Sequence, residues 1–142
     1  MIKIKVVLDT NIYLSGIIFG GNSRHILDLL IEKRVIAFIS PSILLEISQK
    51  LRDKFHWNTE QIQVTVKTIA KTATVVNPQE RLNVVKSDKD DNKILEAAIE
   101  SEANYIISGD KHLLQIKNCR DIEIVSPANF LTIYSKKMKG GE

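Results

Sequence analysis

Two acidic residues stand directly beyond apolar segments that have the character of buried strands. Asp9 follows the run Ile2–Leu8, and Asp110 follows Tyr105–Ser108 after a single glycine. Ligands of an open parallel sheet bind in the crevice beyond the carboxyl ends of its strands. Both aspartates are therefore expected to face that crevice.

Further acids occur where predicted helices begin. Glu46 falls in the second turn of a helix that Ser40-Pro41 would start, and Asp90 and Asp91 lie in the first turn of another. If the apolar neighbours of Glu46 face the sheet, its side chain points toward the same edge. The sequence thus predicts that four acids converge at one place.

Converging carboxylates need something to neutralise them. Two such groups about 4 Å apart repel by roughly 4 kcal/mol at an effective dielectric constant near 20. A raised pKa or a bound cation relieves this repulsion. An all-oxygen site suits Mg²⁺ or Mn²⁺, and the three histidines have no zinc-binding spacing. A divalent ion held by carboxylates supports phosphodiester hydrolysis, because it can activate water and stabilise the leaving oxygen.

The rest of the chain predicts the elements that position these acids. Strands are expected at the apolar runs Ile2–Leu8, Val35–Ile39, Thr74–Val76, Tyr105–Ser108 and Ile122–Val125. Helices are expected over about 23–33, 41–55, 58–73, 87–103, 113–116 and 127–134. The glycines at 16, 20 and 21 predict a loop between Asp9 and Ser23, and Leu82–Val85 is either extended or packed loop. Strands alternating with helices predict an α/β fold with a mostly parallel sheet covered on both faces.

Composition limits the class of protein. The 142 residues are 44% hydrophobic and 26% charged, which fits one globular domain over residues 1–135, followed by a flexible tail over 136–142. No apolar run approaches the roughly 18 residues that a membrane span requires, and Asp9 interrupts the segment where a signal peptide would need its apolar core, so we expect a cytoplasmic protein. The single Cys119 excludes an internal disulfide. The net charge of +3 permits contact with nucleic acid without requiring it.

In their order and spacing the acidic motifs resemble the signature of the PIN-domain ribonucleases. The resemblance rests on Asp9-Thr10-Asn11, Glu46, the segment Asp90–Ala98 that contains Asp91, and Ser108-Gly109-Asp110, and it extends over about residues 3–134. Each motif is weak alone, since many strands end in Asp. Four in order on a matching pattern of strands and helices are more specific.

The resemblance implies a three-layer α/β/α sandwich and cleavage of RNA that depends on Mg²⁺ or Mn²⁺. Carried over position by position, it makes Asp9, Glu46, Asp91 and Asp110 the catalytic acids, with the three aspartates binding metal and with Asn11 and Ser108 in support. Many PIN domains of bacteria and archaea are VapC-like toxins of type II toxin–antitoxin pairs, often dimeric and inhibited by a small antitoxin. The resemblance therefore also implies an antitoxin partner and a homodimer.

Three questions remain open at this stage, and one other class of enzyme is disfavoured. Asp90 could replace Asp91 as the third acid, because the sequence offers neighbouring acids there, and the site could hold one metal ion or two. A catalytically silent PIN-like module that binds RNA or protein would share the fold, although clustered acids without metal do not favour a polyanion. A phosphatase of the haloacid dehalogenase type also begins with Asp at a first strand end, but it requires a second Asp where this chain has Asn11.

Overall fold

The computed structural model describes residues 3–82 and 89–140, which form a layered α/β domain. Its strands are β1 (Lys5–Leu8), β2 (Ile36–Ile39), β3 (Thr74–Val75), β4 (Tyr105–Ile107), β5 (Asn118–Cys119) and β6 (Ile122–Val125). Its helices are α1 (Thr10–Ile18), α2 (Gly21–Ile31), α3 (Pro41–Asp53), α4 (Thr59–Thr72), α5 (Lys89–Ser101), α6 (Lys111–Ile116) and α7 (Pro127–Gly140). None of the described helices is long and apolar enough to cross a membrane.

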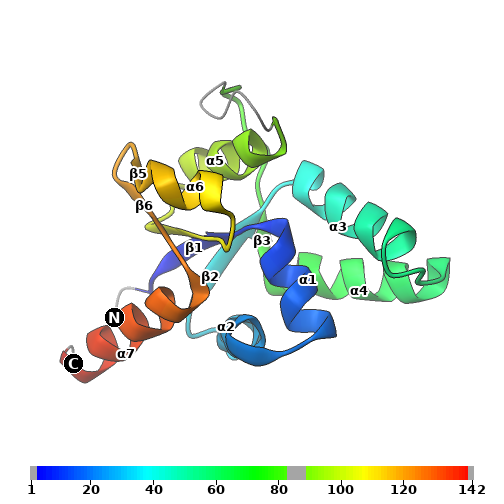
Figure 1. The fold of residues 1–142 in the computed structure, drawn as a ribbon, viewed down its shortest axis with the longest axis horizontal. Coiled ribbons are helices and arrows are strands. Elements are labelled where there is room, and N and C mark those ends of the chain that lie inside the picture. The colour runs from blue at the N-terminus through cyan, green and yellow to red at the C-terminus, as the bar shows by residue number, and fades with distance from the viewer. Residues whose placement is uncertain (1–2, 83–88, 141–142) are drawn as a thin grey trace.

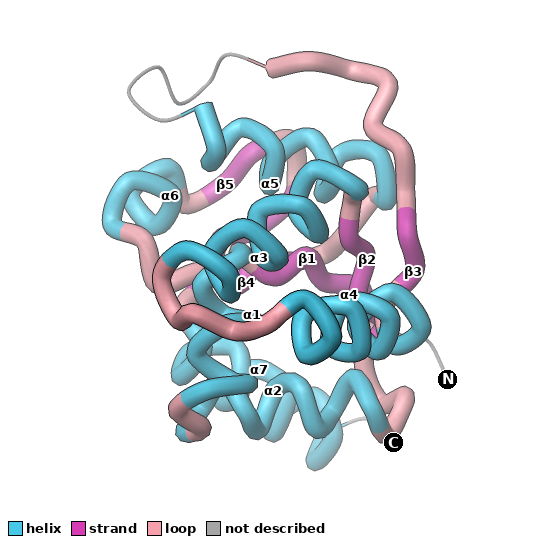
Figure 2. Tube along the Cα trace, turned by 90° about the vertical axis from the view of Figure 1, so that its right-hand side faces the viewer, coloured by secondary structure: helices cyan, strands magenta, loops and turns pink. Residues whose placement is uncertain are grey.

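The strands form one sheet in the order β3-β2-β1-β4-β6-β5, with β5 antiparallel to β6 and the other neighbours parallel. Figures 1 and 2 show α5 and α6 on one side of this sheet and α2 and α7 on the other. The central strand β1 is buried, with Val6, Val7 and Leu8 fully inaccessible to solvent. This arrangement confirms the predicted α/β/α sandwich with a mostly parallel sheet.

Local sequence signals account for several helix starts. The Ser40 side chain accepts a hydrogen bond from the Ile43 backbone N–H, and Pro41 occupies the first position of α3. At the start of α4, Asn58 and Gln61 each bond the other's backbone N–H, which forms the predicted capping box. Both helices begin where the sequence predicted.

The loop predicted between Asp9 and Ser23 is wrong, because most of this segment is helical. Helix α1 starts directly after Asp9, and α2 begins at Gly21 rather than at the expected cap Ser23. Gly16 lies within α1, at a point where this helix packs closely on α2. A Cβ at this position would stand 2.6 Å from Leu27 Cδ1 and 3.0 Å from the Ser23 carbonyl oxygen. The glycines that suggested a loop thus serve helix packing and the sharp turn between two helices.

Other boundaries also differ from the prediction. Helix α7 was expected to end at Tyr134, but it continues to Gly140 through most of the segment predicted as a tail. The two-residue strand β5 was not expected; it forms a hairpin with β6 in which Arg120 and Asp121 have positive φ. Residues Val84 and Val85 of the run Leu82–Val85, and Ser87 and Asp88 of the expected helix start, lie outside the described residues.

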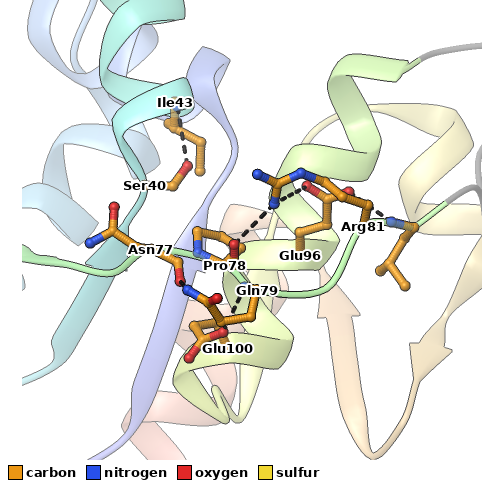
Figure 3. Close-up of polar contacts among 9 residues, drawn as sticks. Ser40, Ile43, Asn77, Pro78, Gln79, Arg81, Glu96 and Glu100 are labelled. Atoms are coloured by element: carbon orange, nitrogen blue, oxygen red, sulfur yellow. Dashed lines mark hydrogen bonds and ion pairs between the residues drawn. The ribbon is translucent and has the colours of Figure 1, made fainter.

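A short extended segment after β3 is fastened to α5 by carboxylates. Glu100 accepts a hydrogen bond from the Gln79 backbone N–H at 3.0 Å, and Glu96 accepts one from Leu82 N–H at 2.8 Å. Arg81 Nη1 lies 4.0 Å from Glu96 Oε1. Figure 3 shows the two side chains pointing toward each other. These contacts place residues 79–82 along α5.

Candidate functional site

The site is built where the two central strands end. Strands β1 and β4 are neighbours, with Leu8 opposite Ile107, so the residues that follow them meet at one edge of the sheet. From β1 the strands β2 and β3 follow in one direction along the sheet and β4 and β6 in the other, and open α/β folds place their ligands at such a reversal of strand order. The backbone N–H of Asp9 continues the ladder by bonding the Ile107 carbonyl at 3.0 Å.

A buried serine links the two aspartates at these strand ends. The Ser108 hydroxyl is fully buried and donates to Asp9 Oδ2 at 2.8 Å. The Ser108 hydroxyl oxygen in turn accepts a hydrogen bond from the Asp110 backbone N–H at 2.9 Å. Ser108 thus fixes the Asp9 carboxylate and the turn that carries Asp110.

Asp110 also caps a helix. Its Oδ1 accepts from the backbone N–H groups of His112 at 2.7 Å and Leu113 at 3.2 Å, at the start of α6. One carboxylate oxygen is therefore used to fix the loop. This bonding holds the Asp110 side chain in one orientation.

The Asp9 carboxyl lies in an unfavourable electrostatic environment. Burial raises its pKa above the ordinary value of 3.8, while the Ser108 hydroxyl and the Asn11 backbone N–H lower it. The negative charges of Glu46 and Asp110 raise it further. Acids from three separate parts of the chain are therefore close enough to influence one another.

Glu46 is held between a hydroxyl and an ammonium group. Thr10, which is 1% exposed, donates from its hydroxyl to Glu46 Oε1 at 2.7 Å. Lys50, one turn further along α3, places Nζ 3.5 Å from Glu46 Oε2 and donates to Asn11 Oδ1 at 3.2 Å. Helix α3 therefore contacts the segment after β1 through polar groups of both elements. No role was predicted from the sequence for Thr10 or Lys50, although the i, i+4 spacing of Glu46 and Lys50 is a signal for their pairing.

Asp91 is contributed by helix α5, which covers one face of the sheet. It lies in the first turn of α5 and is 6% exposed, whereas the side chain of Asp90 is outside the described residues. Helix α5 leads into β4 and packs on β1, β2 and β4, so it runs back across the sheet and its first turn lies toward the carboxyl edge. This is the edge where Asp9 and Asp110 are found.

The donor chemistry of this edge suits a hard divalent cation. The gathered side chains offer carboxylate oxygens, and the pKa of Asp9 is raised chiefly by burial and to a smaller extent by the charges of Glu46 and Asp110. In the described part of the chain, no three His, Cys, Asp or Glu side chains are close enough to hold an ion as they stand. Mg²⁺ often binds through one or two carboxylates plus water and substrate phosphate. Asp9 with one neighbouring acid therefore supplies enough protein ligands for such an ion.

The sequence matches the family model of the PIN domain over residues 5–112, which is more than half of the chain. The chain belongs to the PIN domain family. It is 36% identical to the uncharacterized protein MJ1680 of Methanocaldococcus jannaschii over 149 aligned residues, which cover 95% of this chain and 94% of that protein. The matched region contains Asp9, Glu46, Asp91 and Asp110.

Solved structures share the fold of this PIN domain. A chain in the structure of VapBC2 from Rickettsia felis bound to a promoter DNA fragment is similar with a TM-score of 0.63 and 17% identity, covering 87% of this chain and 98% of that chain. A chain of VapBC-1 from nontypeable Haemophilus influenzae gives a TM-score of 0.62 and 17% identity, covering 88% and 99%. At such identities the likeness establishes the three-layer architecture, and the function must be argued from the site.

Proposed function

We propose that this PIN domain is an endoribonuclease that hydrolyses RNA phosphodiester bonds with Mg²⁺ or Mn²⁺. The observation that carries the proposal is the buried Asp9 carboxylate, whose pKa is raised by burial and by the charges of Glu46 and Asp110. A protein gains nothing for folding by burying a carboxylate among other acids. Such an arrangement is typical of a site that binds a cation.

In this proposal Asp9, Asp91 and Asp110 would supply the metal ligands, two of them to an ion that completes its coordination with water and phosphate, and Glu46 would bind it or orient the attacking water. The bound ion would polarise the phosphate and favour ionisation of a water molecule. Ser108 orients the Asp9 carboxylate by a hydrogen bond, and Asn11 stands at the open rim of the site. The protein residues thus position charge and water around a phosphate that the substrate brings.

The test compares two Asp to Asn variants that change the net charge equally. Asp9→Asn should fold normally and lose Mn²⁺-supported cleavage of single-stranded RNA. Asp121→Asn, in the β5–β6 hairpin at the opposite edge of the sheet, should cleave like the wild type. Undiminished cleavage by Asp9→Asn would refute the assignment, and RNA binding that survives EDTA without cleavage would identify a silent binding module instead.

We further propose that the chain is the toxin of a VapC-like pair and acts as a cytoplasmic homodimer inhibited by a small antitoxin. The fold shared with chains of two VapBC structures supports this assignment. Expression of the chain alone should arrest growth, and co-expression with the neighbouring reading frame should relieve the arrest. Growth arrest that is unchanged in Asp9→Asn would separate toxicity from the nuclease site.

A further inference from the structure

Two surface hollows lie beside the acidic residues. One, of about 540 Å³, lies along α3 and is lined by Glu46, Gln49, Lys50, Asp53 and Lys54. The other, of about 610 Å³, has Asn11, Asp110, Lys111 and His112 among its lining residues. The hydrogen bond from Lys50 to Asn11 joins the two walls. A strand crossing the acidic site would pass from one hollow to the other at this point.

Lys50 has bonding capacity beyond its two contacts in this structure. An ammonium group carries three N–H donors, and Asn11 Oδ1 and Glu46 Oε2 lie within reach of two of them. The side chain of Lys50 is 36% exposed, whereas that of Glu46 is only 14% exposed, so the ammonium stands on the solvent side of the pair. The third donor is available to a group that enters from the hollow.

The electrostatics of the site favour a fixed cation at this position. Acids that gather for catalysis repel the phosphates of the substrate, which must nevertheless lie within contact distance of them. A lysine anchored on two site residues offsets this repulsion between the two hollows. Stability alone is a weak reason for its placement, because an exposed i, i+4 ion pair contributes about 0.3–0.5 kcal/mol.

We propose that Lys50 is a phosphate-binding residue of the substrate site and contacts the RNA backbone where it passes between the two hollows. The inference rests on the proposed ribonuclease function, and it assigns a role to a residue outside the acidic signature. The Glu46 and Asn11 contacts keep the ammonium beside the acids, where it binds the phosphate next to the one that is cleaved.

The experiment measures binding of a fluorescein-labelled single-stranded RNA in Ca²⁺ at several salt concentrations, with gels of the same samples to follow cleavage. Lys50→Met should weaken binding about tenfold, as expected for the loss of one charged hydrogen bond. It should also reduce the slope of log affinity against log salt by about 0.7, the value for one phosphate contact on a single strand. Lys50→Arg should recover most of both quantities.

Lys71→Met is the matched control. Lys71 is exposed in the last turn of α4, which leads into the start of β3 at the opposite edge of the sheet. Equal affinities and salt slopes for Lys50→Met and Lys71→Met would overturn the proposal, as would weaker binding by Lys50→Met with an unchanged slope. These measurements remain informative if the wild type fails to cleave RNA in Mn²⁺, because that result would refute the nuclease proposal while the binding comparison still tests Lys50.

Discussion

Ionisation of Asp9 at neutral pH opposes folding, since the folded protein raises the pKa of this carboxyl above 3.8. Asp9→Asn removes the charge and keeps an oxygen that can accept from Ser108. The variant should therefore be more stable than the wild type at pH 7. Below pH 3.8 the carboxyl is protonated in both the folded and the unfolded wild type, so the difference should vanish there, grow as the pH rises through the raised pKa, and then stay constant.

Urea unfolding of both proteins between pH 3 and pH 8 measures this difference. A variant that is less stable than the wild type at neutral pH would contradict the assigned cause, because burial and like charges would not then dominate over the Ser108 bond. A gain in stability together with lost cleavage is the pattern expected when a charged site is kept for function.

Ser108 offers a second test at the scale of one side chain. Ser108→Ala removes a hydroxyl that bonds both Asp9 Oδ2 and the Asp110 backbone N–H in a fully buried position. We expect a loss of about 1–3 kcal/mol in the free energy of unfolding, because two buried polar groups lose a partner. Ser101→Ala is the control: its hydroxyl bonds carbonyls of its own helix and its removal should cost less than about 1 kcal/mol. Equal losses of stability for both variants would show that the bonds of Ser108 to Asp9 and Asp110 contribute no more than bonds within a helix.

At the scale of elements, the close contact between α1 and α2 depends on Gly16. Alanine in a helix is normally more favourable than glycine by about 1 kcal/mol. Here the added methyl would overlap Leu27 and press on the Ser23 carbonyl, so Gly16→Ala should lower the free energy of unfolding by about 1–3 kcal/mol. Gly140→Ala, where a methyl would meet open space, should be nearly neutral. Calorimetric or denaturant unfolding distinguishes these results, and a stabilised Gly16→Ala would contradict the packing described.

The same helix shows why part of the fold could not be predicted from the sequence. Helix α1 buries residues on most of its faces, among them Ile12, Tyr13 and Leu14, so it lacks the one-sided apolar stripe that identified α3 and α4. Strands and capped helices were predictable because their signals are local, as at Ser40-Pro41 and Asn58. The two-residue β5 carries too little sequence to be recognised.

The residues of the site likewise fall into those whose positions could be predicted from the sequence and those whose positions could not. The positions of Asp9 and Asp110 after adjacent strands could be inferred, because a parallel sheet brings strand ends to one edge. The bonds from Thr10 to Glu46 and from Lys50 to Asn11 could not, since they depend on how α3 is rotated against α1. Pairing across 36 residues of chain leaves no periodic trace in the sequence.

For the molecule as a whole, the proposed metal should act as a ligand of the folded state. The acids arrive from β1, α3, α5 and the turn after β4, so they come together only when the domain is folded. Binding that requires the folded state stabilises it by about 2.7 kcal/mol when the ion is at 100 times its dissociation constant. For a domain of this size the melting temperature should then rise on the order of 10 °C in saturating Mn²⁺. Thermal unfolding of wild type, Asp9→Asn and Asp121→Asn with Mn²⁺ or EDTA tests this without relying on RNA cleavage.

Mn²⁺ should raise the melting temperatures of the wild type and Asp121→Asn equally. It should raise that of Asp9→Asn little, since this variant lacks the central carboxylate. A full gain in Asp9→Asn would mean that the ion binds elsewhere on the protein, and the site proposed at the ends of β1 and β4 would be wrong.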